Sequence, residues 1–580
     1  MKFRLLLLAL PAFVTALLAV QFTDRYQTAQ QLKKLKKYKQ ENAIRCSPDW
    51  DALKDLLDEV DIPPIPGAGS YKWKITTASD SAQFYFNQGI NMYYGFHIIE
   101  AMASFKKAEK FDPAAAMIHW AKALAYGPNI NDLGYAASPD ALTAIQKANE
   151  LSANCTVIEK GLITAQSVRY SADSTQTREH LNQLYADHMQ KLYQEFSSSA
   201  DVAALYADAL MLQHPWDLWF TNGTPKAWTP QIRTVLEKLL AVAPLHPGAN
   251  HYYIHVMEPS PYAALATASA DRLGSLTPAL SHMVHMPSHI YLRTGNYKKG
   301  GAVNETAVNS YKNVLQLFAP AAGADFLYVI HNLHMQTNHG IMSGNMNYAV
   351  ESAKQTAASI PADYLLMEGA LGNYIQYIYY TSILVDVRYA RWDALLAMKQ
   401  PPSAQVYSNV LYHFGKGMAY AHQQKLTEAK KEYRSLSKLL KDSTLSLPFA
   451  PFSPSIDGAT VAANLLAGTI ALAEKNTTVA IDHFSKAVAT EEQMVYNEPR
   501  DWLLNPKHYL GNAYLQMKDW KKAEEVLLND LKNNNNNIWA MSGLHTAYKM
   551  QGKTKEATAL QQQIKKASTN ADVKITAPVL

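Results

Sequence analysis

The strongest constraint on the fold is a recurrence of residues at an interval of 34 positions. A proline and a pair of histidines each return after that interval, so that Pro244, His251 and His255 recur as Pro278, His285 and His289. Thirty-four residues is the length of a unit of two antiparallel helices, which cannot bury its apolar face alone and stacks on copies of itself. The recurrence therefore predicts a helical-repeat protein with similar side chains at one position of successive units.

The stretch from Ala82 to Pro113 has the residues that such a unit requires. It carries a small residue, a tightly packed alanine, an aromatic residue four positions later, a second alanine and a terminating proline, at Gly89, Ala101, Phe105, Ala108 and Pro113. Later copies place similar residues at Gly417, Ala429 and Tyr433, at Gly468, Ala480, Phe484 and Ala487, at Gly511, Tyr514 and Ala523, and at Tyr548 and Ala557. This pattern resembles the tetratricopeptide repeat (TPR). The resemblance implies an all-α fold, an α-solenoid of helix pairs with a concave groove.

The composition agrees with a large helical body. The chain has 580 residues, of which 48% are hydrophobic and 18% charged, enough to bury a continuous core. No Gly-rich phosphate loop and no sustained alternation of β-branched residues occur, so a nucleotide-binding α/β fold has no support. The net charge of +5 is modest and dispersed, and we expect no nucleic acid partner.

The sequence divides into six predicted segments. They are a signal peptide or membrane anchor (1–22), a basic helical or linker segment (23–75), N-terminal TPR-like repeats (76–212), His-rich central repeats (213–363), C-terminal repeats (364–570) and a tail (571–580). In the first segment, Lys2 and Arg4 precede an apolar run from Leu5 to Val20. That run is short for a spanning helix and typical of a signal-peptide core. We expect export to the periplasm or another extracytoplasmic compartment, with attachment to the membrane if the segment is not cleaved.

The two cysteines exclude one kind of metal site. Cys46 and Cys155 are too few for a cysteine metal cage or a disulfide framework. One bridge between them and two separate thiols both fit the sequence.

Histidines are concentrated in the central repeats. Ten of the nineteen lie within residues 214–339. If repeats begin at residues 213, 247, 281 and 330, these histidines fall mainly at positions 2, 5 and 9 of the first helix in each unit, which share one helical face. In TPR proteins that face lines the concave groove. The predicted metal ligands are His214, His251, His255, His282, His285, His289, His331 and His334.

Nitrogen donors held on rigid helices favour a transition metal. Without thiolates and with few carboxylates, the residues indicate one or two copper or zinc ions rather than calcium or magnesium. Four methionines neighbour these histidines, and their thioethers slightly favour copper over zinc, although methionine more often fills a core. They are Met257, Met283, Met286 and Met335. The alternative hypothesis is a scaffold that binds a partner peptide in the groove without metal and uses the histidines for hydrogen bonds.

Several further residues have predicted roles if the groove is an active site. A copper pair would serve an oxidase or oxygenase, whereas zinc would activate water for hydrolysis with Glu258 or Asp217 as general base. Trp216, Tyr253 and Arg293 are predicted to contact a small molecule or peptide in the groove. Pro287 lies inside the first helix of its repeat, and if it opens that helix, His282 and His285 would precede the helix.

Five short segments carry a narrower resemblance. They are Gly95 to Ala101 (Gly-Phe-x-x-x-Glu-Ala), Gly127 to Asn129 (Gly-Pro-Asn), Asn250 to His255 (Asn-His-x-x-x-His), Met286 to Ile290 (Met-Pro-x-His-Ile) and Glu498 to Trp502 (Glu-Pro-x-x-Trp). Together they look like a His-rich exported bacterial subset of TPR proteins, a resemblance that implies no particular reaction. His97 and His119 depart from that pattern, which has Asn and Tyr at these places.

Overall fold

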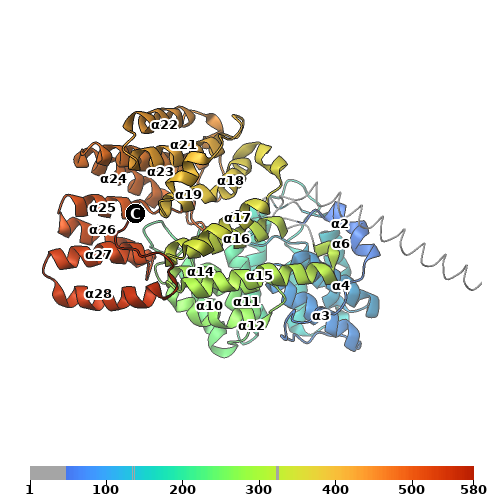
Figure 1. Ribbon diagram of the computed structural model, residues 1–580. Coiled ribbons are helices and arrows are strands. Elements are labelled where there is room, and N and C mark those ends of the chain that lie inside the picture. Colours follow the sequence, from blue (N-terminus) through green and yellow to red (C-terminus); the bar gives the residue numbers. More distant parts are fainter. Residues whose placement is uncertain (1–47, 133–134, 136, 322–324) are drawn as a thin grey trace, which may run out of the picture. The chain divides into compact units, whose positions relative to one another are not determined.

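The computed structural model describes residues 48–132, 135, 137–321 and 325–580. The predicted signal or anchor segment 1–22 and Cys46 lie outside these residues. Within the described ranges the chain forms helices joined mainly by short loops (Figure 1). Extended pairing there is confined to two isolated bridges, Trp219 with Pro225 and Phe449 with Phe452. The predicted all-α architecture is confirmed.

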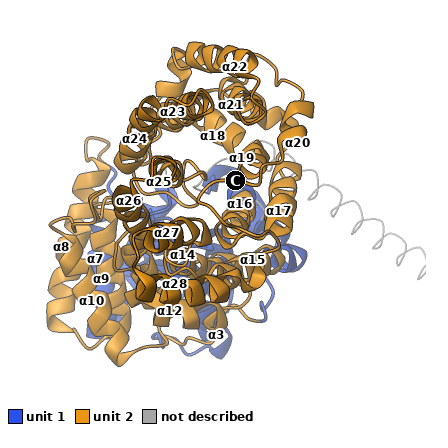
Figure 2. Cartoon of the chain, turned by 60° about the vertical axis from the view of Figure 1, so that its left-hand side comes forward, with its two compact units in different colours: residues 1–66, 74–172, 311–327 blue, residues 67–73, 173–310, 328–580 orange. Residues whose placement is uncertain are grey.

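The chain divides into two compact units, shown in different colours in Figure 2. Unit 1 comprises residues 1–66, 74–172 and 311–327, and unit 2 comprises residues 67–73, 173–310 and 328–580. All predicted metal ligands belong to unit 2. The candidate site is therefore built within one unit.

Unit 1 is an array of helices that begin at ordinary capping residues. They are α2 (Trp50–Glu59), α3 (Asp80–Tyr94), α4 (Ile98–Phe111), α5 (Ala116–Ala125), α6 (Pro139–Leu151) and α7 (Val157–Ser167). The Ser79 side chain caps α3, and Thr156 forms a capping box with Glu159 at the start of α7. Helices α3 and α4 pack so closely that a Cβ on Gly89 would lie 2.4 Å from the Phe105 ring, which explains this glycine.

Unit 2 contains the last two helices of the predicted N-terminal segment, most of the central repeats and the C-terminal repeats, while residues 311–327 belong to unit 1. Its first part is α8 (Arg178–Glu195), α9 (Ala200–Leu212), α10 (Thr229–Val242), α11 (Pro247–Met257), α12 (Thr267–Leu276), α13 (Ser281–His285), α14 (Pro287–Arg293), α15 (Tyr297–Leu317), α16 (Asp325–Ser343) and α17 (Met346–Ala358). The second part is α18 (Gly369–Tyr379), α19 (Thr381–Arg388), α20 (Trp392–Ala397), α21 (Val406–His422), α22 (Leu426–Leu439), α23 (Ser455–Ala473), α24 (Thr477–Gln493), α25 (Pro506–Gln516), α26 (Trp520–Asn533), α27 (Ile538–Met550) and α28 (Thr554–Ala567).

The C-terminal helices pair as the sequence predicts. Gly468 on α23 faces Phe484 on α24, and a Cβ at this glycine would lie 2.4 Å from the ring. Ala480 and Ala487 on α24 are fully buried beside it. The alanines predicted at the packed position of the central repeats, Ala266 and Ala349, are also fully buried.

The first central repeat does not begin where the register predicts, so that prediction is wrong. Helix α9 ends at Leu212, one residue before the predicted start, and residues 213–228 form a loop. Pro215 is followed by Trp216 in the left-handed region at φ 61°, which ends the helix. His214 therefore lies in this loop and not on the inner face of a helix.

The fourth central repeat also starts earlier than predicted. Helix α16 begins at Asp325 rather than at residue 330, and the preceding α15 continues to Leu317. Residues 318–324 therefore separate these two α-helices. His331 and His334 remain one turn apart on α16.

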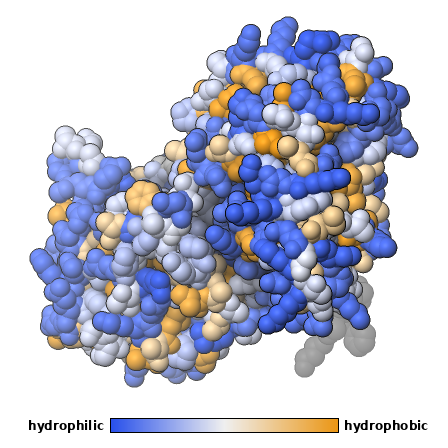
Figure 3. Space-filling model, turned by 90° about the vertical axis from the view of Figure 1, so that its left-hand side faces the viewer, coloured by the Kyte–Doolittle hydropathy of each residue, from blue (hydrophilic) through white to orange (hydrophobic). Residues whose placement is uncertain are grey.

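One described helix, α23, is long and apolar enough to span a membrane. However, 67% of its apolar window is buried inside the protein, as expected for a core helix of the repeats. The molecular face in Figure 3 is mostly hydrophilic, with apolar residues scattered among charged ones.

Candidate metal centre

Short helices place six histidines in one buried cluster. His251 and His255 lie one turn apart on α11, which opens with Pro247 at its first turn. His282 and His285 lie on α13, and His289 lies on α14. His331 on α16 completes the cluster and is the one member that is partly exposed.

Pro287 does not separate the histidines on α13 and α14. Met286, between the two helices, has helical angles of φ −49° and ψ −37°, and its N–H donates to the carbonyl of His282. Pro287 opens α14, where its missing N–H does little harm. The backbone therefore stays helical through the junction, and the three histidines keep their helical spacing.

Three of these residues, His251, His255 and His282, form what we call site A. Each offers one ring nitrogen, and these three atoms lie within 4.8 Å of one another. The Nε2 atoms of His251 and His282 are 3.1 Å apart. All three side chains are buried.

Site B consists of His285, His289 and His331. The Nε2 atom of His285 lies 2.7 Å from that of His289 and 3.1 Å from that of His331. Nitrogen ligands at 2.0–2.1 Å from one tetrahedral zinc ion are about 3.3 Å apart. The three nitrogens of site B are therefore spaced nearly as they would be around a single ion.

Hydrogen bonds at the opposite ring nitrogens orient the imidazoles of site B. His285 Nδ1 lies 2.6 Å from Asn304 Oδ1, and the Asn304 amide nitrogen donates to the carbonyl of Gly300, which fixes the amide orientation. His289 Nδ1 contacts the carboxylates of Glu498 and Glu258. Both rings thus donate Nδ1–H and direct their Nε2 atoms at each other.

Glu258 connects the two sites. Its side chain is fully buried, with one oxygen 3.0 Å from His255 Nδ1 in site A and the other 3.2 Å from His289 Nδ1 in site B. Sites A and B are neighbours, because the rings of His282 and His285 are centred 6.0 Å apart. Glu258 therefore orients one ligand of each site, an arrangement common around metal-binding histidines.

Burial acts oppositely on the acids and bases of this cluster. It raises the pKa of Glu258 and of Glu498 to about 7 and lowers that of His285 well below its usual range. Burial also disfavours charge on His289, but Glu258 and Glu498 together raise its pKa to about 9. The cluster thus favours one positive charge at its centre, which a proton or a metal ion can supply.

Two predicted ligands lie outside both sites. His214 stacks on Trp228 with ring centroids 3.6 Å apart. The Nε2 atom of His334 forms a hydrogen bond with the Thr381 hydroxyl, 3.0 Å away. Burial lowers the pKa of His334 to about 3. The structure brings together six of the eight predicted ligands.

The predicted catalytic carboxylates occupy different surroundings. Asp217 is exposed and pairs with Lys226 at 2.9 Å. Glu258 lies in the cluster, but both its oxygens face Nδ1 atoms of histidines. Within the described residues its Oε2 accepts no hydrogen bond there, and together with His289 and Glu498 it forms a further group of side chains that could hold a metal ion.

Of the three residues predicted to contact a substrate, Trp216 packs against a histidine of the cluster. Its ring meets His255 edge-on at 5.4 Å. Tyr253 instead donates to Glu237 on α10. Arg293 donates to the carbonyl of Ser260 and lies over the ring of Tyr496.

The methionines near the histidines have core positions. Met257, Met283, Met286 and Met335 are all fully buried. Met335 packs in an apolar cluster with Leu292, Tyr297 and Met342. A core role accounts for this residue, so the choice of metal rests on the nitrogen donors.

The sequence did not assign roles to Asn304 and Glu498. Glu498 stands in the Glu-Pro-x-x-Trp segment named above, and that segment was its only signal. It is 209 residues from its partner His289. Asn304 lies on α15 and begins an Asn-x-Thr triplet, a pattern that does not indicate a contact with a histidine.

Motif residues of unit 1 have local structural contacts. His97 and Glu100 pair at 2.9 Å, and both are buried. His119 donates to the carbonyl of Pro113, and the buried Arg169 donates to the carbonyl of Pro128 in the Gly-Pro-Asn turn. These contacts stabilise helix ends and turns.

No protein-family model and no curated protein matches the chain. Solved structures match over most of its length at low identity. A human IFIT1 dimer with m7Gppp-AAAA is 12% identical, covering 89% of this chain and 100% of that chain with a TM-score of 0.33. Yeast Tom70 is 12% identical, covering 93% and 99% with a TM-score of 0.28. The P58(IPK) TPR domain is 13% identical, covering 76% and 99% with a TM-score of 0.20. Similarity this low assigns no function, and it is the helix pairs themselves that make the chain a TPR-like α-solenoid.

Proposed function

We propose that this protein is an exported metalloprotein that binds a pair of transition-metal ions, one at site A and one at site B, with copper preferred to zinc. The export proposal rests on the N-terminal sequence. The metal proposal rests on the geometry of the histidine cluster.

The observation that carries the metal proposal is the convergence of three imidazole Nε2 atoms in site B. The Nε2 atoms of His285 and His289 are 2.7 Å apart, while Nδ1 of each ring is committed to another partner. A proton on His289 is shared with one neighbour at a time, whereas an ion at the centre engages all three imidazoles. Two such triads side by side support a dinuclear centre.

The donor set favours copper. Each site offers three imidazole nitrogens and no thiolate, a set that suits copper and zinc and that binds Cu²⁺ more tightly than Zn²⁺ by the usual order of divalent ions. Three protein ligands leave a coordination position open for a small molecule, as in catalytic metal sites. Glu258 and Glu498 would keep the ligand rings oriented and increase the basicity of the metal-facing nitrogens.

Elemental analysis tests this proposal. Protein purified from its native compartment without chelator is expected to carry about two ions per chain, and the apoprotein should take up Cu²⁺ or Zn²⁺ to the same stoichiometry. A matched variant, His214→Ala, should keep both ions because His214 lies outside sites A and B. Wild-type protein that stays metal-free after Cu²⁺ and Zn²⁺ are both offered would end the proposal.

A further inference from the structure

The predicted tail, residues 571–580, lies against the C-terminal repeats of unit 2. It follows α28 and contains no helix. Its contacts reach α17, α19 and α27, helices that are far apart in the sequence. These contacts concern a region apart from the histidine cluster.

The first contact is between Asp572 and the start of α17. The carboxylate accepts hydrogen bonds from the N–H groups of Met346 and Asn347, at 2.6 and 2.9 Å. Free N–H groups at a helix N-terminus favour a negative charge. The side chain of Asn345 caps the next N–H, that of Tyr348, so Asp572 supplies the acceptors that α17 itself does not have.

The second contact holds Ile575. Its carbonyl accepts a hydrogen bond from the hydroxyl of Ser542 on α27, at 3.2 Å. Its side chain packs on Gly344, where a Cβ would lie 2.6 Å from Ile575 Cδ1. Gly344 has a φ of +71°, so glycine here serves both the turn after α16 and the space for isoleucine.

The third contact holds Pro578, which is buried. Its carbonyl accepts from the guanidinium of Arg388 at 3.2 Å, and its ring lies where a Cβ on Gly543 would be, 2.3 Å from Pro578 Cγ. Arg388 is held in place by stacking on Trp539, 3.6 Å from the ring centroid, and by a 2.7 Å hydrogen bond to His508. A prearranged arginine therefore binds the backbone of the tail.

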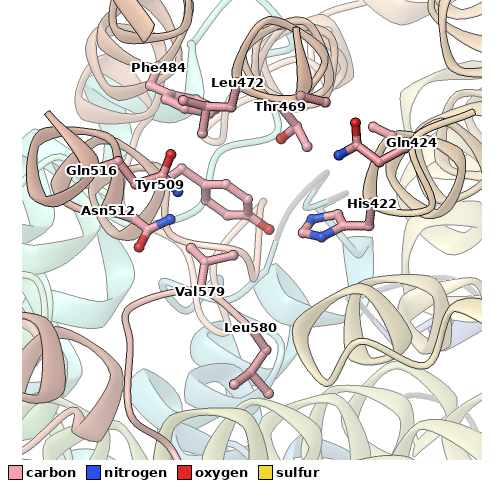
Figure 4. A pocket seen from close by; sticks show the side chains of 12 residues that line it. His422, Gln424, Thr469, Leu472, Phe484, Tyr509, Asn512, Gln516, Val579 and Leu580 are labelled. Carbon is pink, nitrogen blue, oxygen red and sulfur yellow. The ribbon is translucent and has the colours of Figure 1, made fainter. Parts of the chain in front are cut away.

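The last two residues enter a pocket of about 340 Å³ (Figure 4). Val579 and Leu580 line it together with Phe484 and Tyr509. Polar side chains of the same pocket, His422, Thr469, Asn512 and Gln516, come from α21, α23 and α25. The pocket thus offers apolar contact and hydrogen-bonding groups to an extended chain.

The three main contacts recur every three residues, at Asp572, Ile575 and Pro578. The tail is non-helical and bends at residues 572–573 and 577–578, so that each of these three residues meets a different helix. Proteins commonly bind peptide segments through main-chain hydrogen bonds and spaced side-chain contacts. Much of the tail remains partly exposed, as for a bound peptide rather than a core segment.

We propose that this face of the C-terminal repeats binds non-helical peptide segments of the pattern Asp-x-x-Ile-x-x-Pro, and that residues 571–580 occupy this binding groove in cis. A partner with such a segment binds only by displacing the tail. A tethered segment has an effective concentration on the order of 1 mM, so a peptide that binds the emptied groove with a Kd of roughly 10 µM should bind the wild-type chain about 100-fold more weakly.

The test uses the full chain and a fluorescent synthetic peptide of residues 571–580. A full-length variant with Asp572→Lys and Ile575→Asp loses two tail contacts while every residue of the groove stays unchanged. The peptide should bind this variant about 100-fold more tightly than it binds the wild type, as measured by fluorescence anisotropy. A control peptide with the same two substitutions should bind neither protein.

Several outcomes would overturn the proposal. Absence of peptide binding to the variant, with its helical circular dichroism intact, would show that the groove does not bind peptides. Equal binding to variant and wild type would show that the tail does not occupy the site, and equal binding of the control peptide would remove the proposed pattern. If the double variant loses its helical signal, the single variant Asp572→Asn replaces it. In this variant the backbone amides of Met346 and Asn347 should exchange hydrogen faster. Unchanged exchange at these amides would contradict the proposal. Metal content should be unaffected throughout, which separates this test from that of sites A and B.

Discussion

The Nε2 atoms of His285 and His289 lie 2.7 Å apart, although each ring directs its other nitrogen to a different partner. Asn304 fixes the first ring, and the carboxylates of Glu258 and Glu498 fix the second. Two neutral imidazoles held in this way repel each other unless a proton or a cation lies between them. Site B is therefore arranged for a positive charge at its Nε2 atoms by three residues, Asn304, Glu258 and Glu498, which contact the Nδ1 atoms of the same rings.

Replacing His285 with alanine should remove one metal ion and leave the other. His285 makes both close Nε2 contacts of site B and belongs to no other site. Loss of an outer-shell partner alone costs roughly 10- to 100-fold in affinity, so loss of a ligand should exceed tenfold. Elemental analysis after dialysis should give about one ion per chain, whereas two ions retained in His285→Ala would contradict the assignment of this ligand.

Replacing Glu258 with glutamine should weaken both sites, because this one carboxylate orients His255 and His289. We expect a decrease of about tenfold or more in affinity at each site. The matched variant Asn304→Ala should weaken site B alone, since Asn304 contacts His285 but no ligand of site A. Competition with a chelator of known affinity measures the two constants. Equal effects of the two substitutions on both sites would contradict the bridging role of Glu258.

Stability should fall as the pH decreases below about 6.5, partly through His334, whose side chain is fully buried outside sites A and B. Burial lowers the pKa of His334 to about 3, whereas an unfolded histidine titrates near 6.5. Between these values the unfolded chain binds a proton that the folded chain does not, so the free energy of unfolding falls by about 1.4 kcal/mol per pH unit for this group. In His334→Gln the pH slope, measured by urea unfolding from pH 6 to 4.5, should be smaller by about that amount. Identical slopes would show that His334 is not buried in its neutral form.

Replacing Gly468 with alanine should destabilise the C-terminal repeats by about 1–3 kcal/mol, because the new Cβ would overlap the Phe484 ring. Gly274 on α12 provides the control. Its nearest neighbour would be 3.8 Å from an added Cβ, an ordinary contact, so Gly274→Ala should be neutral or stabilising. Chemical denaturation of both variants measures the difference. A neutral Gly468→Ala would indicate looser packing of α23 on α24.

Deleting residues 1–22 should leave the protein in the cytoplasm, because this segment carries the basic start and apolar run of an export signal. Fractionation of cells that express either form measures the distribution. A matched control keeps the segment but replaces Asp217 with asparagine, an exposed change that should not affect export. Full-length protein found in the cytoplasm would contradict the proposal.

The sequence by itself determined the repeat architecture and the concentration of histidines in the central repeats. Glycine and aromatic residues such as Gly468 and Phe484 identify the helix pairs because their contact is local, between the two helices of one repeat. The three- and four-residue spacings likewise put His251 with His255, and His285 with His289, on one helical face. These relationships depend on helix geometry, which the sequence encodes directly.

Only the tertiary structure decided which of these residues meet. The 34-residue register predicts His214 on a helix. In the structure Pro215 and the left-handed backbone of Trp216 form a turn, and His214 lies in the loop that contains it. The meeting of His289 with Glu498 depends on how the repeats between them curve, and no local pattern specifies that curvature. Helical periodicity fixes the face on which a side chain lies, but the packing of distant helices determines what that face contacts. For this reason the histidines and Glu258 could be found in the sequence, while the roles of Glu498 and Asn304 could not.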